Sequence, residues 1–175
     1  MDDLQFIKDR ELRKRLEDSI EYIYALYEQS KTYGQNKLYQ EETHRVIILY
    51  IVSAIEAILF YFYKSRGEKI EYLEYKFLYN LPPEYEHSEK RGFPVVVAVQ
   101  GKAEKREYQL GIYELATFFR DKKLIKKETV EDILDMNDVR NTFHFSKSRA
   151  KICDLERVEK ALKLLGLGEV NRMGQ

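Results

Sequence analysis

The sequence predicts a mainly α-helical protein, a helical bundle of about five helices with a small β-hairpin insertion. Apolar residues recur at steps of three and four in several segments, which is the period of an amphipathic helix. The segment 46–63 is apolar on nearly all sides, as expected of a helix at the centre of a bundle. In the middle of the chain, FPVVVAVQ is dense in β-branched residues, which favours a strand.

Length and composition are those of an ordinary globular domain. We expect the 175 residues to form a single helical domain, with the hairpin segment inserted at about 68–112. Hydrophobic residues make up 44% of the chain and charged residues 34%, which is enough to build a core. The formal net charge is zero, so an anionic partner would require a local basic patch.

The N-terminus and the cysteine count both predict a cytoplasmic protein. The stretch MDDLQFIKDR is charged from its second residue and lacks the apolar core of a signal peptide. Cys153 is the only cysteine, which excludes an internal disulfide and is typical of a reducing compartment.

Two helices are expected in the first third of the chain. Residues 9–32 form the first, with an apolar stripe at Leu12, Leu16, Ile20, Ile23 and Tyr27. Residues 37–66 form the second, which Gly67 ends. Its apolar middle has the length of a membrane span, but Glu56 would then lie at mid-bilayer. We therefore expect no membrane association, and a core helix that also joins two subunits.

The central segment changes character after Gly67. KIEYLEYKFLYN reads either as a short helix or as an irregular strand, because its periodicity fits both. FPVVVAVQ predicts a strand, GKAEK a turn and REYQLGI a return strand, so the hairpin is expected over 94–110.

The last third predicts three further helices. YELATFFRDKK forms the first and KKETVEDILDMNDVRNTFHF the second, with Thr129 and Asp132 spaced as a capping box. DLERVEKALKLLGLG forms the third, in which Asp154 can cap the start and Gly166 the end.

Most motifs of known chemistry are absent from the sequence. It contains no GxxxxGK[ST], GxGxxG, HExxH or GxSxG pattern and no cysteine pair at zinc spacing. The three histidines fall on three different segments. We therefore predict no metal site and no cofactor.

The stretch DMNDVRNTFHF, residues 135–145, carries the residues best suited to chemistry. On a helix Arg140 and His144 share one side, four positions apart. An imidazole titrates near neutrality and can pass a proton, while a guanidinium suits a phosphate. The pair is the minimum set for cleaving RNA without a metal. Such pairs also arise on solvated helix faces, and that alternative stays open.

In its order of elements the chain resembles the HEPN superfamily. The resemblance rests on a long helix carrying IVSAIEAILFYFY, a short helix with its turn in GIYELATFFRDKKLIKKET, a helix ending DILDMNDVRNTFHF, and a closing amphipathic helix. It covers roughly 37–66 and 111–165. The superfamily motif is an Arg, commonly followed by a polar residue, and a His a few positions on.

The resemblance implies a metal-independent endoribonuclease, of the kind found in toxin–antitoxin and antiviral defence systems. Arg140 and His144 would be catalytic, Asn141 the polar residue after the arginine, and Glu56 the acidic residue of the core helix. Glu56 would then pair with Arg140, or alternatively with another core residue. A homodimer is implied, with RNA as substrate and an antitoxin protein as partner.

Two features of the stretch bear on that expectation. Between Arg140 and His144 stand three residues, where ribonucleases of the superfamily usually have four to six, so the alternative is a non-catalytic dimeric module that binds a partner protein or a nucleotide. Basic runs flank the motif helix at 120–127 and 147–151. Of these, Lys147 and Arg149 are the predicted RNA-binding residues.

Overall fold

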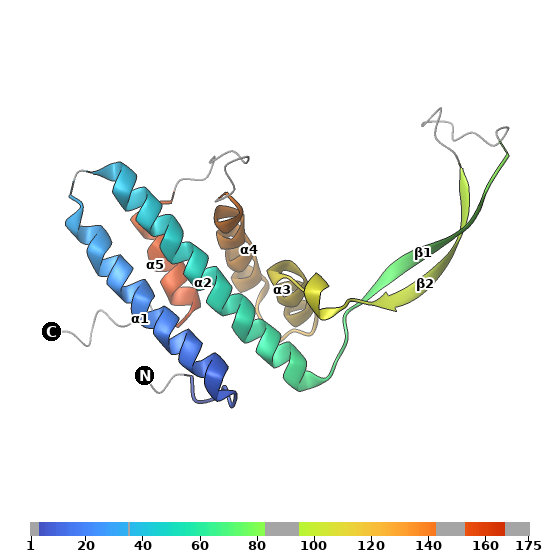
Figure 1. The fold of residues 1–175 in the computed structure, drawn as a ribbon, viewed down its shortest axis with the longest axis horizontal. Helices are drawn as coiled ribbons and strands as arrows, with labels where there is room; N and C mark the ends of the chain where they lie inside the picture. The colour runs from blue at the N-terminus through green and yellow to red at the C-terminus, as the bar shows by residue number, and fades with distance from the viewer. Residues whose placement is uncertain (1–3, 35, 83–94, 143–152, 167–175) are drawn as a thin grey trace. The chain divides into compact units, whose positions relative to one another are not determined.

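The described chain is a helical bundle with a two-stranded hairpin. A computed structural model describes residues 4–34, 36–82, 95–142 and 153–166 (Figure 1). Within these ranges it contains five α-helices, a 3₁₀ turn and one antiparallel sheet. The helices belong to one compact unit, residues 1–67 with 111–175, and residues 68–110 form a second. The predicted fold class is confirmed.

Helix α2 (Lys37–Arg66) is the centre of the bundle, and α1, α3, α4 and α5 all pack against it. Its apolar run is buried most deeply at Ile47, Ile48, Ile51 and Val52. It is the one helix in the described ranges with the length and apolarity of a membrane span, and 44% of its most apolar window is buried within the protein. Packing on several sides is what a core helix requires.

Helix α1 (Arg10–Thr32) lies alongside α2 (Figure 1). The Asp9 carboxylate accepts hydrogen bonds from the first backbone N–H groups and so caps its start. Its predicted stripe is the buried face, at Leu16, Ile20, Ile23 and Tyr27. Gly67 ends α2 in the left-handed conformation at φ 64°, where a Cβ would be strained.

Three shorter helices complete the bundle: α3 (Ile112–Asp121), α4 (Lys127–Asn141) and α5 (Leu155–Leu164). The predicted Asp154 cap is confirmed, since its carboxylate accepts from Arg157 N. The predicted cap at Thr129 and Asp132 is wrong. Helix α4 begins at Lys127 without a side-chain cap, so both residues already lie within its first turns.

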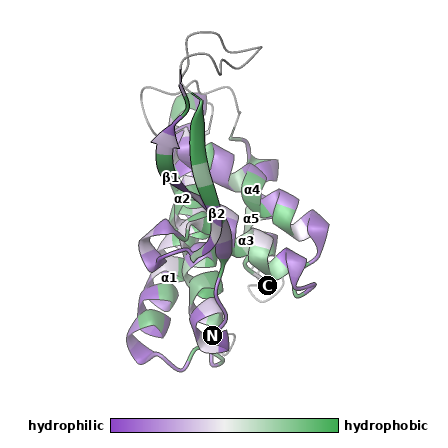
Figure 2. Ribbon diagram, turned by 90° about the vertical axis from the view of Figure 1, so that its right-hand side faces the viewer, coloured by the Kyte–Doolittle hydropathy of each residue, from purple (hydrophilic) through white to green (hydrophobic). Residues whose placement is uncertain are grey.

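The hairpin pairs different segments from those predicted. Strand β1 (Glu71–Asn80) pairs with β2 (Val96–Glu104) in antiparallel register, Glu71 opposite Glu104. GKAE is therefore strand rather than turn, and REYQLGI supplies the 3₁₀ turn and the start of α3. The expectation of a hairpin over 94–110 was wrong. Much of β2 has the colour of hydrophobic residues (Figure 2).

Candidate functional site

Arg140 lies in the last turn of α4 and forms an ion pair with Glu56 of α2. Arg140 Nη1 donates to Glu56 Oε2 at 2.8 Å. The side chains are 32% and 26% exposed, so the pair lies at the edge of the core, where solvent reaches it. Glu56 was expected to pair either with Arg140 or with another core residue, and the described residues show the pair with Arg140.

The sequence explains why this pair forms. Along α2, Glu56 follows the buried Ile55 and interrupts an apolar run, and a carboxylate in such a place needs a partner. On α4, the buried residues Met136 and Val139 mark the face that packs against the bundle. Arg140 comes next in sequence and lies at the edge of that face. The ion pair therefore joins α2 to α4 at the border between their apolar contact and solvent.

The start of α3 lies beside this ion pair. The Glu114 carboxylate accepts from the Gly111 backbone N–H at 3.1 Å. A methyl group built on Gly111 would lie 3.4 Å from Glu114 Oε2 and 4.0 Å from Glu56 Oε1. Two carboxylates thus approach the amino end of α3, where the helix dipole favours negative charge.

A second arginine, which the sequence analysis did not identify, holds the C-terminal end of α4. Arg45 of α2 is 1% exposed, and its Nη1 donates to Thr142 Oγ1 at 2.8 Å. Its Nη2 donates to Glu41 Oε1 at 2.7 Å. The Thr142 hydroxyl in turn donates to the Val139 carbonyl. A buried guanidinium thereby fixes the residue that precedes 143–152.

The residue that follows 143–152 is held at the neighbouring position of α2. His44 Nδ1 lies 3.2 Å from the Cys153 carbonyl oxygen, within hydrogen-bond distance. Cys153 is buried, and this burial raises the pKa of its thiol from 9.0 to about 12. His44 and Arg45 therefore hold the two chain ends that flank residues 143–152.

Three of the predicted site residues, His144, Lys147 and Arg149, lie outside the described residues. Asn141 is the last residue of α4 and is partly exposed. Arg140 and Glu56, 84 positions apart in sequence, are the two predicted site residues between which a contact is described.

Arg45, which the sequence analysis missed, has one signal in the sequence: Glu41 stands one helical turn before it at the edge of the apolar run.

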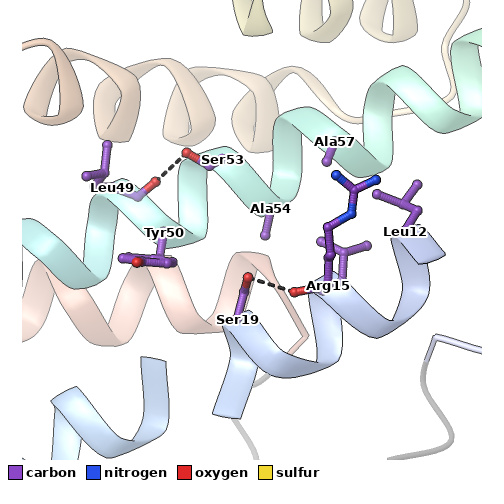
Figure 3. A pocket seen from close by; sticks show the side chains of 9 residues that line it. Leu12, Arg15, Ser19, Leu49, Tyr50, Ser53, Ala54 and Ala57 are labelled. Carbon is purple, nitrogen blue, oxygen red and sulfur yellow. Dashed lines mark hydrogen bonds between the residues drawn. The ribbon is translucent and has the colours of Figure 1, made fainter. Parts of the chain in front are cut away.

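A groove of about 390 Å³ lies between α1 and α2. Small side chains of α2 form its floor, and Tyr50 and Arg15 flank it (Figure 3). Ser53 and Ser19 each donate to a carbonyl of their own helix, at Leu49 and Arg15. Of the predicted site residues that the structure describes, none lines the groove, although Ala57, the neighbour of Glu56, does.

Comparison with known proteins adds no relative. No family model, no curated protein and no solved structure matches the chain.

Proposed function

We propose that the chain is an HEPN-like, metal-independent endoribonuclease, a toxin or an antiviral-defence component. The observation that supports this proposal is the 2.8 Å ion pair between Arg140 and Glu56. It holds the guanidinium at the end of α4, four positions before His144 in the sequence. An arginine fixed by a carboxylate on the core helix is what the resemblance implies for a catalytic arginine.

The role of Arg140 follows from its donors. A guanidinium carries five N–H groups, so an arginine that donates one to Glu56 can still donate to a phosphate oxygen. During cleavage, negative charge develops on the non-bridging oxygens of the phosphate. A cation whose position is already fixed stabilises that charge without reorganising.

The remaining steps need one group that moves a proton, and we assign it to His144. The neutral imidazole takes the proton of the 2′-hydroxyl while the 2′-oxygen forms a bond to phosphorus. The bond between phosphorus and the 5′-oxygen breaks, and the imidazolium returns the proton to that oxygen. The products are a 2′,3′-cyclic phosphate and a 5′-hydroxyl. Asn141 would position the phosphate, and Lys147 and Arg149 would bind the backbone.

One observation favours the alternative, a non-catalytic dimeric module that binds a partner protein or a nucleotide. The Glu56–Arg140 pair also joins α2 to α4, and a purely structural bundle benefits from that contact equally. In that case the arginine serves the fold and the protein cleaves nothing.

The two functions separate in a cleavage assay. The purified protein is incubated with structured and unstructured RNA in the presence of EDTA, and the product ends are identified. Ribonuclease activity predicts cleavage that survives chelation and is lost in His144→Ala and Arg140→Ala. Arg120→Ala, which removes an arginine from the last turn of α3, is the matched control and should cleave normally. A folded protein without cleavage would favour the binding module.

A further inference from the structure

The outer edge of strand β1 is built to pair with itself, and we propose that it joins two copies of the chain. The described sheet has two strands, so β1 has β2 on one side and no further strand of the described residues on the other. Two-stranded sheets are marginally stable in water, and an open edge can accept another strand. This inference goes beyond RNA cleavage and does not depend on it.

The hydrogen-bond pattern identifies which residues of β1 face that edge. Lys105 N donates to the Ile70 carbonyl at 2.8 Å, so these two residues form a hydrogen-bonded pair. In an antiparallel ladder such pairs alternate. Even positions from 70 to 76 therefore bond to β2. The backbone N–H and C=O groups of Leu73, Tyr75 and Phe77 point to the open edge.

The same three residues line one face of the hairpin. Leu73, Tyr75 and Phe77 are 57%, 65% and 59% exposed. A second β1 strand in antiparallel register about Tyr75 would set Tyr75 against Tyr75 of the other copy. Leu73 of each copy would lie opposite Phe77 of the other copy. The outward backbone groups match in this register, and an apolar row continues across both copies.

Charge selects this register over its neighbours. With the twofold axis at Tyr75, Glu74 stands opposite Lys76 of the second copy, and the reciprocal pair forms as well. An axis at position 74 would place Glu74 opposite itself, and an axis at position 76 would place Lys76 opposite itself. Directly opposed like charges destabilise a sheet, whereas unlike charges stabilise it. Within β1, only the register centred on Tyr75 sets unlike charges opposite each other.

The open edge of β2 is less suited to such pairing. Its outward positions are the even residues from 96 to 104, and the axis at its centre falls on Gln100. Lys102 would then oppose Ala98 and Glu104 would oppose Val96, so no unlike charges meet. A register about Ala103 would set Lys102 against Glu104 of the other copy. Both side chains already form ion pairs within the hairpin, Lys102 with Glu71 and Glu104 with Lys69, and that register uses only the end of the strand. The occupant that fits the open side of β1 is therefore a second copy of β1.

Charge reversal tests the pairing. We expect Glu74→Lys and Lys76→Glu each to halve the molar mass measured by sedimentation. An equimolar mixture of the two variants, and the swap Glu74→Lys/Lys76→Glu, should each restore the wild-type mass. Val96→Lys, at an exposed position of the opposite edge outside the paired stretch, is the control and should leave the mass unchanged. A monomeric wild type, or a mixture that stays dissociated, would overturn the proposal.

Cysteine pairs test the register independently of assembly size. Glu74→Cys mixed with Lys76→Cys should form an intermolecular disulfide on oxidation, because opposed residues between hydrogen-bonded pairs lie closest. Neither variant alone should cross-link, since each cysteine is then offset from its copy. The native Cys153 is buried and does not compete. Cross-linking of either variant alone as efficient as that of the mixture would refute this register.

Discussion

The guanidinium of Arg45 donates to the hydroxyl of Thr142 at 2.8 Å, across 97 positions of sequence. The arginine is buried at the start of the apolar run of α2, and the threonine follows the last residue of α4. The bond therefore connects the core helix to the end of the segment that carries the proposed site.

Removing the Thr142 hydroxyl should destabilise the fold. In Thr142→Val the buried guanidinium loses an acceptor, which costs about 1–3 kcal/mol in the free energy of unfolding. Thr142→Ser keeps the hydroxyl and should stay within about 0.5 kcal/mol of the wild type. Urea denaturation followed by circular dichroism measures both. Equal stabilities of the two variants would show that the hydrogen bond is not needed.

The Glu56–Arg140 pair should contribute a modest coupling energy. Its partial exposure limits the interaction, so Glu56→Gln or Arg140→Gln should each cost about 1 kcal/mol. A double-mutant cycle isolates the pair, and the double variant should lose less than the sum of the single ones. Additive losses would indicate that the two side chains act independently. If Glu56 positions Arg140 for cleavage, Glu56→Gln also lowers kcat while RNA binding is retained.

The Cys153 thiol should be protected in the native protein. Burial raises its pKa from 9.0 to about 12, so the reactive thiolate is scarce at pH 8. Ellman's reagent should react slowly in buffer and rapidly in urea. Fast native labelling would mean that the contact between His44 and the Cys153 carbonyl opens readily.

The same thiol should make stability depend on pH. The folded state retains the proton above pH 9, where the unfolded chain releases it. The stabilising contribution is therefore complete below pH 9 and is lost as the pH rises to about 12. Urea titrations at several alkaline pH values measure this loss of stability. In Cys153→Ala the part of the loss that comes from the thiol should be absent.

Core and groove positions of α2 should respond differently to truncation. Ile51 is fully buried, and Ile51→Ala should cost about 2–5 kcal/mol through lost contacts and the cavity left behind. Ser53 is exposed in the groove, and Ser53→Ala should change stability by less than about 0.5 kcal/mol. Thermal unfolding compares the two. A large cost at Ser53 would mean that its hydrogen bond to the Leu49 carbonyl contributes to stability.

Deleting the hairpin should leave the helical unit folded. The buried residues of the five helices lie within residues 1–67 and 111–175, so replacing 68–110 by a Gly/Ser linker removes little of that core. Cooperative thermal unfolding of the helical signal is the measurement. Loss of cooperativity would show that the insert is an integral part of the domain. A dimer that persisted without the hairpin would be held through the helical unit and would contradict pairing through β1.

The helices were predictable because their information is local. The stripe from Leu16 to Tyr27, the Asp154 cap and Gly67 each follow from spacing or backbone preference within a few residues. The hairpin was not, because its strands pair across the intervening residues 81–95 and GKAE has turn chemistry inside a strand. β-branched density located β2, but no local rule identifies its partner.

The candidate site divides in the same way. Glu56 was recognisable as a charge inside an apolar helix, and Arg140 as its partner through the family resemblance. Arg45 was missed because its role depends on Thr142, which only packing brings near. A buried hydrogen bond between distant segments leaves no periodic trace in the sequence.

The irregularity in β1 limits how far sheets of this protein can grow. Phe77 and Leu78 together oppose Ala98, so the register shifts there and the regular edge ends. Fibrils form most readily from long, flat, uninterrupted edges. The bulge bends the strand at its seventh residue, so the flat stretch of edge ends at Phe77. The bend thereby works against the edge-to-edge stacking that exposed apolar strand residues would otherwise favour.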